Sequence, residues 1–340
     1  MRRILLVCLS LWSLAPVAQG QESTAVMRFP EVRDPERSNR SVPIKVHLPG
    51  STSVAEAPFP VVIISHGAGG TWDANFAQAQ HLAQHGYAVL AVEHVGSNFD
   101  RFKAAGGVVD ALKSMTRNAT EVMNRPQDIG FAIDQLLEWN RSHPTLQGQL
   151  DPERIGVMGH SFGAYTALVS CGARPALDWL VPAQGRGLGP DLSDPRVKAC
   201  VALSPQGPGE PFFLEESYAS VNRPVLGITG SRDVQQFQLS PTHRRRFLDL
   251  MPAGETYFLW LTNADHSAFS DPSGSGRRGL PSRSRTDAQP VVKEATLQFF
   301  NVFVRGDESA RAYLTANHLE TFLQGKITEL EWTHKEAPAP

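Results

Sequence analysis

The strongest constraint on the fold of this chain is its alternation of short runs rich in β-branched and other apolar residues with longer stretches of helical periodicity. Such alternation is typical of an α/β protein, because neighbouring parallel strands need a crossover connection. Two runs, 61–64 and 87–92, are apolar at every position, as expected for central strands covered on both faces. We therefore predict a mostly parallel, eight-stranded sheet with helices on both faces. The expected strands are 24–29, 42–48, 60–65, 87–93, 153–158, 197–203, 224–229 and 255–261.

Helices are expected between the strands. One over 74–84 stops at Gly86, and another begins near Pro126, because proline suits a first helical turn. Further helices are expected at 162–171, 241–250, 288–303 and 308–324. Three long connections, 94–123, 172–195 and 204–222, are typical of lid-like excursions over a site. A flexible surface loop is expected at 270–286, and its arginines, like the run Arg244-Arg245-Arg246, are interpreted as solvated charge.

The N-terminus has the pattern of an export signal. Two arginines precede a short apolar run over 4–12, and small residues stand at 18 and 20, where a signal peptidase acts. The run is short for a membrane span, so an uncleaved anchor is the weaker alternative. We expect a signal peptide over 1–20, one domain over 21–325 and a flexible tail over 326–340, in a protein exported to a periplasm or secreted.

The composition argues against several classes of protein. The 32 Lys and Arg residues are balanced by 34 Asp and Glu, whereas a nucleic-acid-binding surface needs a concentrated basic excess. A chain of 340 residues that is 41% hydrophobic can build a large core. No Cys-x-x-Cys pair or Cys/His cluster has the spacing of a zinc site. We expect no metal, no organic cofactor, no nucleic-acid partner and no integral membrane span in the mature chain.

The strongest chemical signal is Gly159-His160-Ser161-Phe162-Gly163, which follows the strand 153–158 and precedes a helical run. In this strand–turn–helix context a Gly-x-Ser-x-Gly motif is a nucleophile elbow. The two glycines are needed because side chains there would collide with backbone at the sharp turn. Ser161 is therefore the candidate nucleophile. His160 points away from the same turn, so we assign it a packing role.

A serine hydroxyl needs a base, and the base needs an orienting carboxylate. In this type of fold the order along the chain is serine, acid, histidine, with the acid and the histidine after later strands. Asp233 follows the strand 224–229, and His266 follows the strand 255–261, so both fit. The adjacent Asp265 is better explained as a turn cap.

The run Ser65-His66-Gly67-Ala68-Gly69-Gly70 follows another strand and suits an oxyanion-binding loop. Acyl transfer needs two fixed N–H donors for the developing oxyanion. We assign these to the backbone of Phe162 and of Ala68, with Gly67 the near alternative to Ala68. A phosphate-binding loop is disfavoured, because no Lys-Ser/Thr follows the glycines.

These motifs together resemble the α/β-hydrolase superfamily of serine hydrolases. Within it they are similar to exported bacterial proteins named predicted dienelactone hydrolases, relatives of the secreted platelet-activating-factor acetylhydrolases. Two departures matter: true dienelactone hydrolases use a cysteine nucleophile, and in the animal acetylhydrolases the acid follows an earlier strand, where this chain reads Ala202-Leu203-Ser204-Pro205. The second departure favours Asp233. The resemblance runs from about 40 to 303 and is carried by 65–70, 92–98, 125–129, 159–164 and 264–266.

The expected activity is that of a serine carboxylic-ester hydrolase on small-molecule or lipid-like esters. Lipase, phospholipase A-type acetylhydrolase, polyester hydrolase and serine peptidase activities are the alternatives on the same fold, and a non-catalytic binding protein is the remote one. Trp72 and His94 are candidates to line the substrate pocket.

The mature chain keeps two cysteines, Cys171 and Cys200. Cys171 lies about 15 Å along the helix that Ser161 begins, and Cys200 lies about 13 Å below the carboxyl end of a strand. The two thus fall at a similar depth below the active face. A disulfide and two buried thiols are both compatible with this placement.

Overall fold

The computed structural model describes residues 24–50, 56–234, 240–271 and 283–336. Its centre is a nine-stranded sheet in which six strands run parallel, while β1 and β4 at one edge and β11 at the other pair antiparallel. All eight expected strands are present. In spatial order the strands are β1 (Ala25–Phe29), β4 (Ile44–Leu48), β6 (Ala88–Val92), β5 (Phe59–Ser65), β7 (Leu150–His160), β8 (Val197–Leu203), β9 (Val225–Arg232), β10 (Thr256–Asp265) and β11 (Leu330–Lys335).

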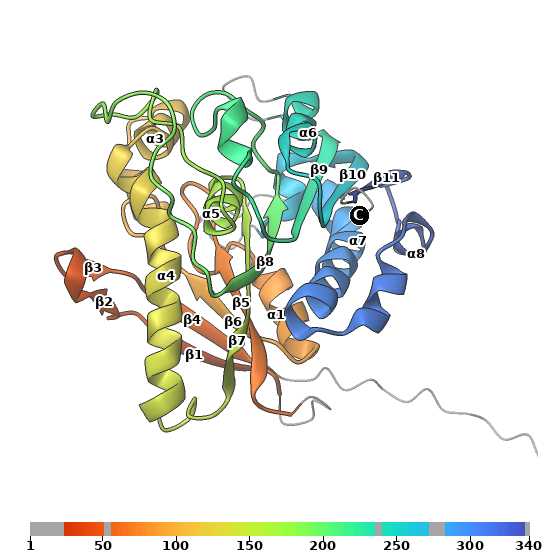
Figure 1. Cartoon of the computed structure of the whole chain (residues 1–340), viewed down its shortest axis with the longest axis horizontal. Helices are drawn as coiled ribbons and strands as arrows, with labels where there is room; N and C mark the ends of the chain where they lie inside the picture. The colour runs from red at the N-terminus through yellow and green to blue at the C-terminus, as the bar shows by residue number, and fades with distance from the viewer. Residues whose placement is uncertain (1–23, 51–55, 235–239, 272–282, 337–340) are drawn as a thin grey trace, which may run out of the picture.

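Helices cover both faces of the sheet, as Figure 1 shows. On one face lie α4 (Ala119–Ser142), α5 (Phe162–Ser170) and α6 (Pro241–Leu250), and on the other lie α1 (Phe76–Gln84) and α7 (Arg283–Phe300). Strand β5 shows why both faces are covered. Val61 and Ile63 pack in an apolar cluster with α4, α5 and α6, whereas Val62 and Ile64 pack in a second apolar cluster with α1 and α7. Successive side chains of a strand point to opposite faces, so a continuous apolar run needs cover on both.

Smaller elements complete the chain. A two-stranded ribbon, β2 (Arg33–Asp34) with β3 (Arg40–Ser41), packs beside α4, and short helical turns follow several strands. The turns are η1 (Pro35–Arg37), η2 (Glu215–Tyr218), η3 (His266–Phe269), η5 (Asn301–Arg305) and η6 (Glu308–Tyr313), with the short helix α8 (Ala316–Glu320).

Several expected boundaries were wrong. The tail expected to be flexible from 326 contains β11, which pairs with β10 from Leu330 to Lys335. Helix α4 begins seven residues before Pro126, because Asn118 caps its first turn by accepting a hydrogen bond from the N–H of Glu121. Helix α7 begins at Arg283, inside the expected loop, and the helix expected over 308–324 is the pair η6 and α8. The proposed signal peptide, the loop centre at 272–282 and the last four residues lie outside the described residues.

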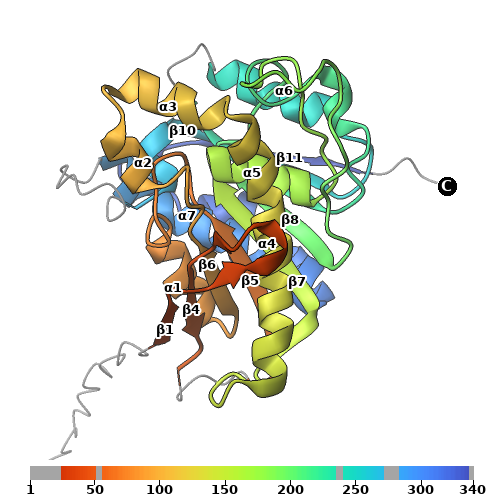
Figure 2. The same cartoon turned by 90° about the vertical axis from the view of Figure 1, so that its left-hand side faces the viewer.

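The long connections lie at the end of the molecule to which the parallel strands lead. Connection 94–123 contains α2 (Phe99–Ala104) and α3 (Val108–Thr116), at the top of the view in Figure 2. Helix α2 packs closely on the glycine-rich loop after β5, since a β-carbon on Gly69 would lie 2.9 Å from the ring of Phe102. In the part of the chain that the structure describes, no helix is long and apolar enough to cross a bilayer.

Candidate active site

The turn between β7 and α5 holds Ser161 in a strained conformation, with φ of 58° and ψ of −116°. Both glycines that flank this turn are required, because a side chain at either position would collide with backbone atoms. A β-carbon on Gly159 would lie 2.3 Å from the carbonyl oxygen of Gly163, and one on Gly163 would lie 2.0 Å from that of Ser65. The sharp turn therefore packs directly on β5 and holds Ser161 at the carboxyl end of the sheet, before the N-terminus of α5.

The structure brings Asp233 and His266 together from the ends of β9 and β10. Nδ1 of His266 lies 2.7 Å from Oδ1 of Asp233, and the hydroxyl of Thr229 donates to Oδ2 at 2.7 Å. Because a carboxylate only accepts, the imidazole proton sits on Nδ1, and Nε2 keeps its lone pair. Burial alone would raise the pKa of the Asp233 carboxyl, but the charges of His266 and Arg244 outweigh it and hold that pKa below its ordinary value.

The interpretation of Arg244 as solvated charge was wrong. Its side chain is fully buried, and its Nε lies 3.1 Å from Oδ1 of Asp233. It also donates to three carbonyl oxygens, those of Asp233, Ser204 and Pro205, at 2.9–3.1 Å. Arg245 and Arg246 point outward and pair with surface glutamates. The spacing of Arg244 with Phe247 and Leu248 on the buried face of α6 was the signal that could have separated it from its neighbours.

His160 and Asp265, which lie beside His266, have the packing and turn-capping roles expected of them. Nε2 of His160 donates to the carbonyl oxygen of His266 at 3.0 Å, and the two rings lie 4.6 Å apart. Asp265 caps the turn after β10 by accepting from the N–H of Ser267 at 2.9 Å. These contacts hold the backbone of the histidine against the residue that precedes Ser161.

The glycine-rich loop after β5 lies against the serine. A β-carbon on Gly67 would be 3.4 Å from the β-carbon of Ser161. The carbonyl of Gly67 is held by Nδ1 of His66 at 2.6 Å, and Nε2 of that ring accepts from the N–H of His94 at 3.0 Å. Within the described residues the N–H groups of Ala68 and Phe162 have no acceptor in the protein. Two donors are therefore available on the segments that border Ser161.

Comparison with known proteins shows what this chain is similar to. Residues 60–224 match the family described as alpha/beta hydrolase fold. This match and the mostly parallel sheet with helices on both faces show the α/β-hydrolase fold. The chain is 25% identical over 175 residues to Cutinase 1 of Thermobifida cellulosilytica, covering 51% of this chain and 55% of the cutinase.

Two further relatives carry related names. A bis(hydroxyethyl) terephthalate hydrolase of Streptomyces coelicolor is 23% identical over 169 residues, covering 49% of this chain and 43% of that protein. A platelet-activating factor acetylhydrolase of Cavia porcellus is 27% identical over 175 residues, covering 42% and 39%. The matched region spans about half, or less, of the length of these curated relatives.

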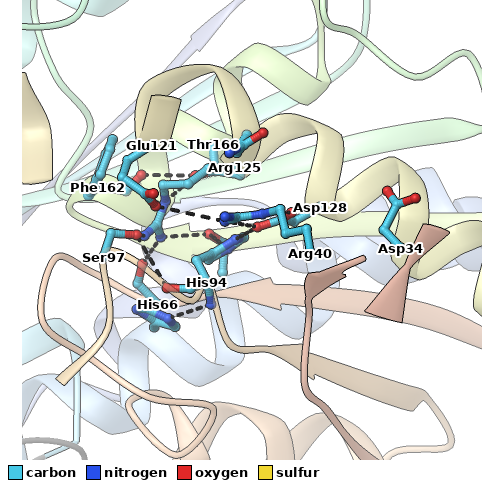
Figure 3. Close-up of polar contacts among 12 residues, drawn as sticks. Asp34, Arg40, His66, His94, Ser97, Glu121, Arg125, Asp128, Phe162 and Thr166 are labelled. Atoms are coloured by element: carbon cyan, nitrogen blue, oxygen red, sulfur yellow. Dashed lines mark hydrogen bonds and ion pairs between the residues drawn. The ribbon is translucent and has the colours of Figure 1, made fainter. Parts of the chain in front are cut away.

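The prediction that His94 lines a substrate pocket was wrong, because the residue has no exposed surface. Figure 3 shows it within a buried polar cluster, with Nδ1 2.9 Å from Oδ2 of Asp128. Its Nε2 accepts from the hydroxyl of Ser65 at 2.9 Å. Burial and the nearby Arg125 charge lower the pKa of His94 to about 3, so the ring is neutral at physiological pH.

Arg125 and Asp128 were noticed in the sequence only as part of a resemblance, and both are fully buried. Asp128 accepts from Arg40 at 2.8 and 2.9 Å and forms an ion pair with Arg37 at 2.7 Å. Burial would raise the pKa of Asp128, but hydrogen bonds from Arg40 and His94 outweigh it and lower that pKa. The sequence signal for this buried pair was the spacing of Arg125 and Asp128, which are three residues apart and so lie on one face of a helix.

The remaining predicted residues lie farther from the chemistry. Trp72 is half-buried, with the ammonium of Lys45 5.7 Å from its ring centroid, and its place in a substrate pocket stays a prediction. Cys171 and Cys200 form a disulfide with a Cα–Cα distance of 6.4 Å, which joins the end of α5 to β8. Among the described residues no group of three or more His, Cys, Asp or Glu side chains is arranged to hold a metal ion.

Proposed function

We propose that this protein is a carboxylic-ester hydrolase that works through a covalent acyl-enzyme. The α/β-hydrolase fold and the ester hydrolases among the relatives support the reaction class. The observation that carries the proposal is the hydrogen bond between His266 and fully buried Asp233, at the same sheet edge as the strained Ser161.

In the proposed reaction, Oγ of Ser161 attacks the ester carbonyl carbon while Nε2 of His266 takes the hydroxyl proton. The oxyanion is bound by the N–H groups of Phe162 and Ala68. The imidazolium then gives its proton to the leaving alcohol. Water attacks the acyl-serine in the second half, with the same histidine first as base and then as acid. Asp233 keeps the ring in the Nδ1–H tautomer and stabilises its positive charge.

For the substrate we propose uncharged esters with short acyl groups. Two of the relatives are named as hydrolases of cutin and of bis(hydroxyethyl) terephthalate, and a third as an acetylhydrolase. A panel of p-nitrophenyl esters of graded acyl length, bis(hydroxyethyl) terephthalate, a short-chain phospholipid and a peptide anilide separates the alternatives. Highest kcat/KM on the peptide or on long acyl chains contradicts this choice.

We also propose that the protein acts outside the cytoplasm. The disulfide between Cys171 and Cys200 suits an oxidising compartment. The export signal expected over residues 1–20 agrees with that placement. Fractionation of cells that express the full chain tests it, and protein found only in the cytoplasm contradicts it.

A fluorophosphonate probe tests the nucleophile directly. Ser161→Ala should abolish both labelling and ester turnover. Ser170→Ala is the matched control, because Ser170 is also buried and sits in the same helix, where its hydroxyl only donates to the carbonyl of Thr166. Labelling that persists in Ser161→Ala would overturn the assignment.

A further inference from the structure

A single buried cation touches both backbone segments that border Ser161. Arg125, in the second turn of α4, has no exposed surface. Its Nη2 donates to the carbonyl oxygen of His66, in the loop after β5, and to the hydroxyl of Ser65 at 3.1 Å. Its Nε donates to the hydroxyl of Thr166 in α5 at 3.0 Å. Figure 3 shows the guanidinium between these two segments.

The contact of Arg125 with the loop after β5 determines the direction of a backbone N–H group. A trans peptide is planar, so its N–H points opposite to its carbonyl. Arg125 holds the carbonyl of His66, and thereby directs the N–H of Gly67 away from the cation. The imidazole of His66 holds the carbonyl of Gly67 and in the same way directs the N–H of Ala68. Both candidate loop donors therefore depend on peptide planes that are anchored on their carbonyl side.

The contact with α5 holds the residue that carries the other donor. The hydroxyl of Thr166 accepts from Arg125 and donates to the carbonyl oxygen of Phe162 at 3.0 Å. The guanidinium carbon also lies 4.3 Å from the centroid of the Phe162 ring, a cation–π distance. The first residue of α5, whose N–H borders Ser161, is thus held by its ring and its carbonyl at once.

Maintaining this charge in the core has an energetic cost, because a buried cation loses its hydration. Burial lowers the pKa of Arg125 to about 9, yet leaves the group protonated at neutral pH. The planar guanidinium offers five N–H donors in a rigid fork, which a lysine cannot reproduce. Here the fork spans the loop after β5, Ser97 and α5.

We propose that Arg125 is a positioning residue that sets the separation of the two segments that carry the oxyanion donors. The inference rests on the proposed ester hydrolysis, in which these donors bind the oxyanion. Arg125 touches no reacting atom in this scheme. It acts by clamping the loop after β5 to the N-terminal turn of α5.

The test compares two pairs of variants. Arg125→Lys keeps the charge but loses the fork, and Arg141→Gln alters an exposed arginine on the same helix. Thr166→Val removes the hydroxyl that links Arg125 to α5. Ser97→Ala is its matched control, because that hydroxyl also accepts from Arg125, at 2.8 Å, but lies on neither donor segment. Each variant is assayed for kcat, KM, thermal melting and affinity for an alkylboronic acid, whose tetrahedral serine adduct occupies the oxyanion site.

For Arg125→Lys and Thr166→Val we expect kcat to fall by about 10- to 100-fold, less than the roughly 10²- to 10³-fold loss of a donor itself. Boronate affinity should fall with kcat/KM, while KM changes by less than about threefold. Ser97→Ala and Arg141→Gln should keep both parameters within about threefold. If Arg125→Lys and Thr166→Val lower only the melting temperature, or raise only KM, the positioning role is refuted. Failure of the proposed function itself looks different, since the wild type would then neither turn over esters nor label with a fluorophosphonate.

Discussion

Under the proposed mechanism, Asp233→Asn should be much less damaging than the same change usually is in a serine hydrolase triad, because Arg244 dictates how the new amide is oriented. Oδ1 faces both His266, at 2.7 Å, and Nε of Arg244, at 3.1 Å, while Oδ2 faces the hydroxyl of Thr229 at 2.7 Å. An NH2 group in the place of Oδ1 would point at a cation. In the place of Oδ2 it can donate to the threonine hydroxyl, which rotates to accept.

The magnitude follows from these contacts. Placing the amide nitrogen beside Arg244 forfeits a charged contact worth about 1.5–3 kcal/mol and the hydrogen bond from His266, worth about 1 kcal/mol. A preference of roughly 3 kcal/mol corresponds to a population ratio of more than about 100 to 1. It favours the amide orientation that keeps a carbonyl oxygen on Nδ1 of His266. The imidazole thus keeps its productive tautomer and loses only the carboxylate charge. We expect kcat/KM to fall by about 10²-fold, against the roughly 10⁴-fold typical when the tautomer is wrong.

Initial rates on p-nitrophenyl butyrate for Asp233→Asn, Asp233→Ala, Arg244→Met and the double variant Asp233→Asn/Arg244→Met check this reasoning. Without Arg244 the amide has no preferred orientation, so about half of the molecules hold the unproductive tautomer. The double variant should therefore lose about twofold more activity than the product of the single effects predicts. Melting temperatures confirm that each variant is folded. A loss for Asp233→Asn as large as that of Asp233→Ala, or an additive double variant, refutes the argument.

Three further predictions concern stability. Reducing the disulfide between Cys171 and Cys200 should lower the free energy of unfolding by about 3.6 kcal/mol, from the chain entropy of a loop with a separation of 29 residues, and urea unfolding with and without reductant measures it. Burial and the charge of Lys45 lower the pKa of His47 to about 4, so its protonation in the unfolded chain, with a pKa of about 6.5, removes stability as the pH falls from about 6.5 toward 4. His47→Gln should therefore reduce the stability lost between pH 7.5 and 5.5 by about 1.3 kcal/mol, and an unchanged pH dependence of urea unfolding contradicts this. Gly163→Ala should lower the free energy of unfolding by more than about 3 kcal/mol, because its methyl group would lie 2.0 Å from the backbone carbonyl oxygen of Ser65. Gly106→Ala is the control, because its methyl group would have no atom within 4 Å, and it should change the melting temperature little.

Much of the sheet could be predicted because its central strands are buried on both faces. The run from Val61 to Ile64 is apolar at every position and lies in two separate clusters, one on each side. Strand β11 was missed for the opposite reason. It is an edge strand in which Leu330 and Trp332 alternate with polar residues, and it is nowhere fully buried, so its short pattern resembles that of an exposed tail.

The start of α4 shows how a local rule can fail. Proline near a helix start was interpreted as the first turn, yet Pro126 lies inside the helix, after a turn capped by Asn118. The loss of one backbone hydrogen bond at this proline is tolerated in a helix whose neighbouring side chains, Arg125 and Asp128, are tied to β-strand ends and loops. Tertiary contacts thus outweigh the local preference.

The residues that carry the candidate chemistry were accessible to sequence reasoning because each follows the end of a strand, where a parallel sheet presents its functional groups. The arginines behind them follow no strand end. Arg244 also stands in a charge run, which is usually solvated, and only its helical spacing with Phe247 and Leu248 distinguishes it from its neighbours. Arg244 faces Asp233 and Arg125 faces the loop after β5, each from a helix on the same face of the sheet. Both are fully buried. Arg244 donates to the carbonyl oxygens of Asp233, Ser204 and Pro205, and Arg125 donates to the carbonyl oxygen of His66, all in loops that follow strands. Two helices thus brace the two halves of the candidate site independently, so substitutions at Arg125 and Arg244 should affect oxyanion binding and the acid–base pair separately.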